Sequence, residues 1–224
     1  MGKDYQPKHR QASDLARKKA RRASYDRVLI VTEGSKTEPN YLNEIRVANR
    51  IHTANVQVEP SAFGTEPIQI TEYAETLFLN GDESKSILPR AFEEVYVVFD
   101  RDDHRTYHNA LSKIKSLNSK FKNDNQQKVT FKAIASVPCF ELWLLLHFED
   151  IQAAMHRDVV YERLKSYIPN YQKGDEGHYA LTLPHIEVAK ARATLLCRRN
   201  DENDGTQPYT NVYELINKLS KLNQ

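Results

Sequence analysis

The sequence predicts an α/β protein with a parallel sheet of about four strands, helices on the sheet, and a helical C-terminal elaboration. Two observations carry this prediction. Short runs rich in β-branched residues alternate with amphipathic segments over residues 27–135, beginning and ending with a strand. Several of these runs are apolar at nearly every position, which is typical of strands buried on both faces of a parallel sheet.

The first strand is expected at residues 27–32, RVLIVT, and is followed by a turn at residues 33–35. A helix then opens near Thr37, with Pro39 in its first turn, where the missing N–H of proline costs nothing. The apolar stripe of this helix consists of Tyr41, Leu42, Ile45 and Ala48. The pattern continues with strands at 55–59, 94–100 and 128–133, and with helices at 67–79 and about 103–118.

Beyond residue 135 the pattern becomes helical. Residues 140–148 are apolar nearly all round and predict a buried helix. Further helices are expected near 158–168, 184–199 and 211–222, with surface loops at 170–178 and 200–208. The last helix is amphipathic and offers one contact surface for a homo-oligomer. The chain is therefore divided into a basic arm at 1–26, an α/β domain at 27–150, and a helical extension at 151–224 packed on it.

Charge is unevenly distributed along the chain. Residues 1–27 hold nine basic and three acidic residues, a net charge of +6, whereas the other 23 basic and 27 acidic residues give −4. The arm is either a flexible, solubilising tail or a segment that grips a polyanion and becomes helical on contact. No run approaches the roughly 20 apolar residues of a membrane span, so no membrane association is expected.

The N-terminal residues contain no apolar stretch, so no secretory signal is expected. The two cysteines, Cys139 and Cys197, cannot form a disulfide framework or a zinc site by themselves. Both observations favour a protein of the reducing cytoplasm.

Carboxylates follow two of the expected strands. Glu33 comes directly after the first strand, and Asp100 ends the strand at 94–100, with Asp102 and Asp103 behind it. The carboxyl ends of parallel strands lie at one edge of the sheet, so Glu33, Asp100 and Asp102 converge there if the strands are neighbours or one apart. Carboxylate oxygens without soft ligands select Mg²⁺ or Mn²⁺. The alternative is that the aspartates cap a helix or form a turn.

A divalent ion at this edge indicates metal-assisted phosphoryl transfer. Gly34 lets the backbone approach a ligand, and Ser35, Lys36 and Thr37 supply donors near a helix N-terminus, where phosphate binds readily. With Gly34 and Lys36, Arg101 and His104 complete the expected substrate-binding residues. His104 and His108 have a spacing that two zinc ligands can use, but no third nitrogen or sulfur ligand is nearby in the sequence.

A first strand ending in Glu-Gly and a later strand ending in Asp-x-Asp resemble the Toprim fold of topoisomerases, primases and old-type nucleases. Three motifs resemble the RloB family more closely, which is also met as the second component of the abortive-infection system AbiL (AbiLii). They are VTEGSKTEPNY at 31–41, VFDRDDH at 98–104 and PCFELWLLLHF at 138–148. QPYTNVYEL at 207–215 matches less specifically.

The resemblance implies a Toprim-like, Mg²⁺-dependent nuclease of bacterial antiphage defence, encoded beside an ATPase of the AAA or ABC type. It implies that Glu33 is the acid/base or metal residue, and that Asp100 and Asp102 are metal ligands with Asp103 close to them. Activity is expected to stay latent until the partner signals infection. The sequence contains no base-reading motif and therefore does not choose between DNA and RNA, including tRNA.

Glu141 is the one ionised group in the apolar run 139–146. It either extends the metal site as a further catalytic carboxylate or pairs with an arginine, because a buried charge needs a partner. His147, in the same segment, is read as a core histidine.

Three functions are compatible with these residues. The first is a metal-dependent endonuclease, in which Glu33 activates water while Asp100 and Asp102 hold Mg²⁺ against the scissile phosphate. The second is a non-catalytic nucleic-acid-binding or regulatory subunit of a defence complex. The third is a phosphatase or nucleotide-processing enzyme. The extra carboxylate of Glu33 and the lack of a small-residue loop after Asp100 count against it.

Overall fold

The computed structural model describes residues 26–202 and 208–222. These residues form a sheet of five strands in the order β2-β1-β3-β4-β5, in which all neighbours are parallel except β4 and β5. The first half runs β1 (Val28–Thr32), α2 (Thr37–Ala48), β2 (Val56–Pro60), α3 (Pro67–Asn80), β3 (Glu94–Asp100), α4 (Tyr107–Leu117) and β4 (Thr130–Val137). The second half runs α5 (Glu141–Leu145), α6 (Arg157–Tyr167), α7 (His178–Thr182), the 3₁₀ turn η1 (Leu183–His185), α8 (Ile186–Glu202), β5 (Tyr209–Thr210) and α9 (Val212–Lys221).

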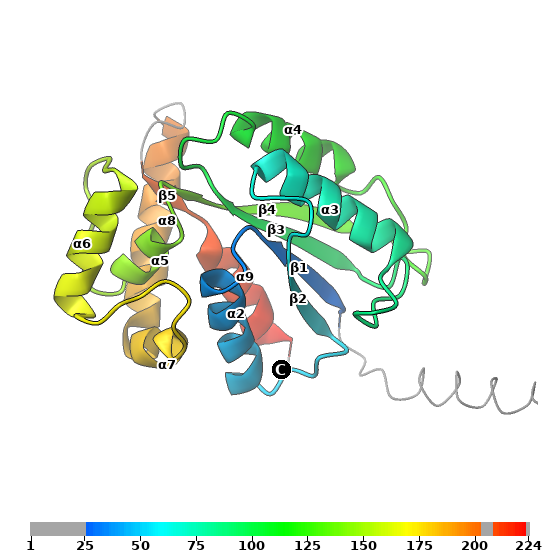
Figure 1. Ribbon diagram of the computed structural model, residues 1–224, viewed down its shortest axis with the longest axis horizontal. Coiled ribbons are helices and arrows are strands. Elements are labelled where there is room, and N and C mark those ends of the chain that lie inside the picture. Colours follow the sequence, from blue (N-terminus) through cyan, green and yellow to red (C-terminus); the bar gives the residue numbers. More distant parts are fainter. Residues whose placement is uncertain (1–25, 203–207, 223–224) are drawn as a thin grey trace, which may run out of the picture.

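Helices cover both faces of the sheet (Figure 1). Alternate residues of β1 point to opposite faces, so Val28 and Ile30 enter one hydrophobic cluster and Leu29 and Val31 enter another. The first cluster contains side chains of α2, α5, α8 and α9, and the second contains those of α3 and α4. The α/β class, the mostly parallel sheet and the flanking helices are thus confirmed, and they are consistent with a Toprim-like fold.

The structure adds a fifth strand. Thr210 and Tyr209 of β5 pair antiparallel with Ser136 and Val137 of β4, and β4 itself extends four residues beyond the predicted end at Ala133. The side chain of Asn211 continues this pairing, because it accepts a hydrogen bond from the Ala135 N–H and donates one to the Ala133 carbonyl. A strand of two residues has no periodicity that a sequence pattern can reveal.

Two expected helices are shorter than their patterns. The apolar run 140–148 is helical only from Glu141 to Leu145, and the polar helix expected from residue 103 begins at Tyr107. The loop expected at 170–178 ends where α7 begins, at His178. In the described part of the chain, no helix combines the length and apolarity of a membrane span.

The apolar face of α9 belongs to the core, which makes the expectation of a contact surface there wrong. Its buried side chains are Val212, Leu215, Ile216 and Leu219. They share one cluster with Leu142 of α5 and with Val160 of α6, so residues on both sides of position 150 contribute to the same core. The basic arm lies outside the described residues except for Asp26, which accepts a hydrogen bond from Lys218.

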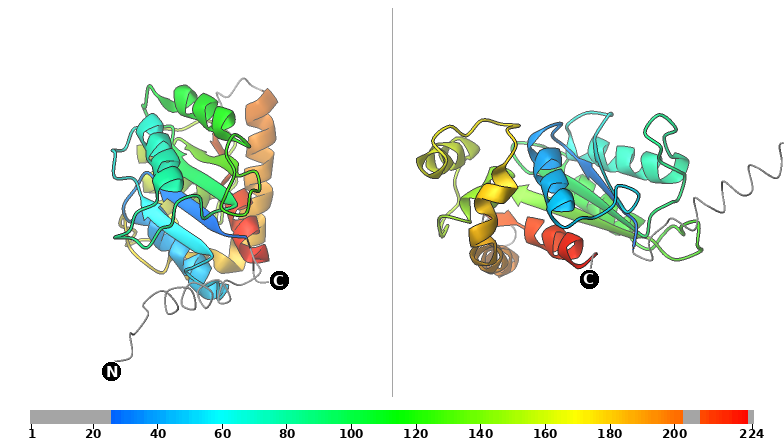
Figure 2. Two further views of the ribbon diagram at one scale, coloured as in Figure 1. Left: turned by 90° about the vertical axis from the view of Figure 1, so that its right-hand side faces the viewer. Right: turned by 90° about the horizontal axis from the view of Figure 1, so that it is seen from below.

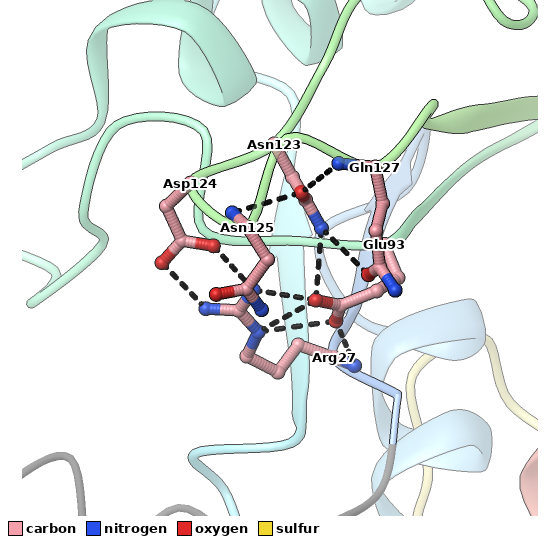
Figure 3. Close-up of polar contacts among 6 residues, drawn as sticks. All are labelled: Arg27, Glu93, Asn123, Asp124, Asn125 and Gln127. Carbon is pink, nitrogen blue, oxygen red and sulfur yellow. Dashed lines mark hydrogen bonds and ion pairs between the residues drawn. The ribbon is translucent and has the colours of Figure 1, made fainter.

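A polar clasp, formed by Arg27, Glu93, Asn123 and Asp124, fastens the N-terminal ends of the strands (Figure 3). The guanidinium of Arg27 donates to Glu93 at 3.0 Å and to Asp124 at 2.8 Å. Asn123 also donates to Glu93, at 2.9 Å. Because Arg27 precedes β1, Glu93 precedes β3 and Asp124 lies before β4, the clasp joins three neighbouring strands at the edge opposite the site described next.

The views in Figure 2 show the same layers from two further sides. The helices α3 and α4 lie together on one face of the sheet, and α2 and α9 lie on the other. The C-terminal ends of β1 and β3, where the loops after these strands begin, lie between these two layers of helices.

Candidate metal centre

A cavity of about 450 Å³ opens at the C-terminal ends of β1 and β3. In Figure 1 these strand ends point toward the side of the molecule where α5 and α6 lie. The residues that line the cavity are Glu33, Gly34, Ser35, Lys36, Thr37, Glu38, Thr65, Asp100, Asp102, His104, Glu141, Arg157 and Lys173. Five of these side chains are carboxylates, so the floor of the cavity concentrates negative charge.

Glu33 and Asp100 meet because β1 and β3 are neighbours in register. The Glu33 N–H donates to the Val98 carbonyl at 2.9 Å, which continues the pairing of the two strands. The Glu33 carboxylate in turn accepts a hydrogen bond from the backbone N–H of Asp100, with 2.9 Å between Oε2 and N. The expectation that the two strand ends converge is therefore met by a direct contact.

Asp102 is held in the left-handed region, with φ 35°. Its N–H donates to the carbonyl of Pro138 at 3.1 Å, and its Oδ2 accepts a hydrogen bond from Arg157 at 2.6 Å. The other oxygen, Oδ1, is buried and has no hydrogen-bond partner among the described residues. A buried acceptor without a partner is costly, so this oxygen is well suited to a cation.

His104 bridges two carboxylates. Its Nε2 lies 3.4 Å from Glu33 Oε1, and its Nδ1 lies 3.1 Å from Glu66 Oε1. Thr106 holds Glu66 in place by donating to its second oxygen at 2.6 Å. Burial opposes the protonated form, but the hydrogen bond to Glu66 and the charge of Glu33 outweigh it and raise the pKa of His104.

Glu33, Asp102 and His104 form a set that can hold a metal ion. Each offers one ligand atom, and the three atoms lie within 4.8 Å of one another. Mg²⁺ and Mn²⁺ accept carboxylate oxygens, while imidazole nitrogen is a more usual ligand of transition metals such as Zn²⁺, Fe²⁺ and Ni²⁺. His104, expected among the substrate-binding residues, thus lies among the candidate ligands.

Glu38, Asp100 and Glu141 lie deeper. Their exposed fractions are 7%, 8% and 2%. Glu141 accepts a hydrogen bond from the Tyr171 hydroxyl at 2.9 Å, and the Lys173 ammonium lies 3.8 Å from the same oxygen. Glu141 thus lines the cavity with the other carboxylates, and its described ion-pair partner is this lysine instead of the expected arginine.

Burial makes ionisation of these carboxylates costly. It raises the pKa of Glu33, of Asp102 and, with added repulsion from Glu38, of Asp100. Burial and the neighbouring charges of Glu141 and Glu33 raise the pKa of Glu38 to about 7. A divalent cation offsets both the burial and the repulsion, so the donor set and the unpartnered Asp102 oxygen fit such an ion.

Two expected residues do not line the cavity. Asp103 is exposed, and the Arg101 guanidinium lies over the Tyr107 ring, 5.7 Å from its centroid. Gly34 and Lys36 do line it. A Cβ at Gly34 would meet the Glu38 carboxylate, so a side chain at this position would require that carboxylate to move.

Four lining residues were not singled out from the sequence: Glu38, Thr65, Arg157 and Lys173. The burial of Glu38 could have been predicted from the sequence. It precedes Tyr41, Leu42 and Ile45 by three, four and seven positions and so shares their buried helix face. Lys173 lies in the loop before α7, and hydrogen bonds connect this loop to α2. Gly174 N–H donates to the Thr37 hydroxyl at 3.0 Å, and Asn40 donates to the Gly174 carbonyl at 2.9 Å.

Comparison with known proteins gives one family match. The family model described as RloB-like protein matches residues 28–219, which include every residue that lines the cavity. No curated protein and no solved structure matches the chain.

Proposed function

The chain belongs to the RloB-like family, and on this premise we propose that it is a Mg²⁺-dependent, Toprim-like nuclease that hydrolyses phosphodiester bonds of DNA or tRNA. The observation that carries the proposal is the cluster of Glu33, Asp102 and His104, whose ligand atoms lie within 4.8 Å of one another beside buried Asp100. A bound divalent cation would lower the pKa of a water molecule and neutralise charge on the phosphate.

Each residue of the cluster has a proposed role. Glu33, Asp102 and His104 hold the cation, and Asp100 with Glu38 and Glu141 supplies the surrounding negative charge. In hydrolysis the water oxygen bonds to phosphorus, the bond from phosphorus to the leaving ester oxygen breaks, and the water proton passes to a base. Glu33 is the candidate base, because its carboxylate lines the cavity beside the position proposed for the cation.

His104 would bind the cation as a neutral ring, since a protonated imidazole has no lone pair to offer a metal. The hydrogen bond to Glu66 and the charge of Glu33 raise the pKa of His104, so binding of the cation would release a proton from it. Water would protonate the leaving oxygen. Lys36 and Gly34, at the mouth of the same cavity, are the proposed phosphate contacts. Arg101 and Asp103 stay outside the proposed core of the site, since neither lines the cavity.

The biological setting is proposed from family membership. The protein would act in the bacterial cytoplasm in antiphage or abortive-infection defence, beside an AAA- or ABC-type ATPase that releases its activity. No G-x-x-x-x-G-K-[ST] run occurs in the sequence, so an ATP requirement would come from that partner.

Cleavage assays test the proposal. Purified protein, alone and with the co-expressed ATPase, is incubated with DNA, RNA and tRNA in Mg²⁺, Mn²⁺ or EDTA. Cleavage that requires the metal and is lost in Asp102→Asn supports a nuclease. Binding without cleavage in every condition, unchanged by EDTA, identifies the non-catalytic subunit instead.

A further inference from the structure

The cavity wall that faces the carboxylates is basic and comes from outside the sheet. Arg157 lies in the first turn of α6, and Lys173 lies in the loop that connects α6 to α7. One aromatic ring positions both side chains. The Arg157 guanidinium carbon is 5.8 Å and the Lys173 ammonium 4.8 Å from the centroid of Tyr161.

Both cations contact carboxylates of the candidate metal centre. Arg157 donates to Asp102 at 2.6 Å, and Lys173 lies 3.8 Å from Glu141. Burial within each pair is unequal. The acidic side chains are 11% and 2% exposed, whereas Arg157 is 36% and Lys173 is 52% exposed. The basic side chains thus reach from the open mouth of the cavity down to acids that are largely buried.

Charge balance links these contacts to metal binding. In the protein without an ion, Arg157 and Lys173 supply positive charge to a floor of five carboxylates. A divalent cation among the same carboxylates supplies that charge itself, so the attraction that holds the two side chains falls. The coupling is reciprocal, so a side chain that the ion displaces also weakens the binding of the ion.

Released side chains at the mouth of the cavity are suited to phosphate. Arginine presents a planar fork that matches two phosphate oxygens, and lysine adds a point charge. We propose that Arg157 and Lys173 form a phosphate clamp, which Asp102 and Glu141 hold in the metal-free protein and which turns to the substrate phosphate when a divalent cation binds. The clamp rests on the proposed function and adds an order of events, because phosphate then binds well only after the metal.

The first experiment measures metal binding alone. Mn²⁺ is titrated by calorimetry into the full chain and into Arg157→Gln, without phosphate. The clamp predicts that Arg157→Gln binds Mn²⁺ roughly three- to tenfold more tightly, because a competing charge is gone. Arg163→Gln is the matched control, since Arg163 lies on the same helix, pairs with Glu149 and does not line the cavity.

The second experiment measures phosphate binding. The probe is thymidine 3′,5′-bisphosphate, with Ca²⁺ as a divalent ion that seldom supports hydrolysis. In the unaltered chain Ca²⁺ should increase the affinity of the probe, and Arg157→Gln or Lys173→Gln should lower it roughly tenfold in Ca²⁺. Arg157→Lys keeps the charge but loses the planar fork, so its affinity for the probe should lie between those of the unaltered chain and Arg157→Gln.

Changes in affinity that differ from these expectations would contradict the clamp. If Arg157 only orients Asp102, Arg157→Gln weakens Mn²⁺ binding, and the clamp is wrong. Unchanged probe affinity in Lys173→Gln also overturns it, and this half-exposed residue serves the test if Arg157→Gln unfolds. Failure of Mn²⁺ to bind the unaltered chain refutes the metal centre and the clamp together. Mn²⁺ binding with metal-dependent cleavage, but no effect of either substitution, refutes the clamp alone.

Discussion

The carboxylate of Glu33 accepts a hydrogen bond from the backbone N–H of Asp100, so the residue after β1 is fixed to the last residue of β3. This bond orients one oxygen of Glu33 toward the strand and leaves the other, Oε1, beside His104. The position of the candidate base is therefore set by the sheet itself.

Glu33→Gln should abolish cleavage and leave the fold intact. The amide oxygen of glutamine can still accept the Asp100 N–H, but it neither takes a proton nor offers an anionic metal ligand. The expected loss in rate is roughly 10²–10⁴-fold, with a melting temperature close to that of the unaltered chain. Glu187→Gln, at an exposed carboxylate on α8, is the control. Cleavage that persists in Glu33→Gln would contradict the assigned role.

Glu38→Gln should stabilise the metal-free protein. Glu38 is buried beside the charges of Glu141 and Glu33, and glutamine removes one member of this repelling set. In EDTA at pH 8 we expect a melting temperature higher by about 2–4 °C, for roughly 1 kcal/mol gained. The rise in melting temperature that Mn²⁺ causes should shrink in the same variant. A lower melting temperature in EDTA would show that the Glu38 carboxylate stabilises the fold.

His147 should make stability fall in mild acid. Its Nδ1 donates to the carbonyl oxygens of Trp143 and Leu144, while Nε2 is buried without a hydrogen-bond partner among the described residues. Burial lowers the pKa of His147 from 6.5 to about 4. Because the unfolded chain takes up the proton at higher pH than the folded one, stability is lost as pH falls from 6.5 toward 4, by up to roughly 3 kcal/mol.

Urea unfolding at several pH values in this window measures the effect. The dependence on pH should flatten in His147→Gln, which cannot titrate, and should be unchanged in His52→Gln, at an exposed histidine. Equal slopes in all three proteins would exclude His147 as the source.

Glu93→Ala should destabilise the fold without affecting the metal centre. It leaves the guanidinium of Arg27, a residue 6% exposed, without one of its two carboxylate partners. Breaking a buried ion pair from one side costs about 3–5 kcal/mol, measurable by chemical unfolding, whereas Mn²⁺ affinity should not change. Lys132→Ala, which breaks a more exposed pair with Glu214, should cost under about 1 kcal/mol. Similar losses in both variants would argue against a special role of the clasp.

Deletion of residues 1–24 should weaken nucleic-acid binding and flatten its dependence on salt. These residues carry eight basic and two acidic side chains, and the salt slope falls by roughly one for each phosphate that the shortened chain no longer neutralises. Filter binding at several salt concentrations measures the slope, and single-turnover cleavage at saturating substrate should keep its rate. Unchanged binding would identify the arm as a solubilising tail.

The two central strands β1 and β3 were the clearest predictions from the sequence, because they are buried on both faces. Residues 28–31 and 95–99 are apolar without interruption, and the structure buries every one of them. Of the five described strands, only β5 was not predicted, since its two residues take their conformation from pairing with β4. The core position of α9 was also not predicted, because an amphipathic pattern marks an apolar face and does not say what covers it.

Some residues of the candidate site could likewise be predicted from the sequence, and others could not. Glu33, Asp100 and Asp102 follow strand ends, and parallel pairing brings such positions together whatever the loops do. Asp103 is one position further, past a residue with positive φ, and the turn leaves its side chain exposed. Arg157 and Lys173 reach the cavity only through the packing of α6 and the ties between Gly174 and α2, which no local pattern encodes.

The pairing of Asn211 and β5 with β4 has a consequence for biosynthesis. While a ribosome is still adding residues beyond the candidate site, the outer backbone groups of Ala133, Ala135 and Ser136 have no protein partner, since those partners are residues 210 and 211. An open strand edge of this kind invites association with other chains. The pairing of the strand that leads toward Glu141 is thus completed only after residues 209–211 have emerged.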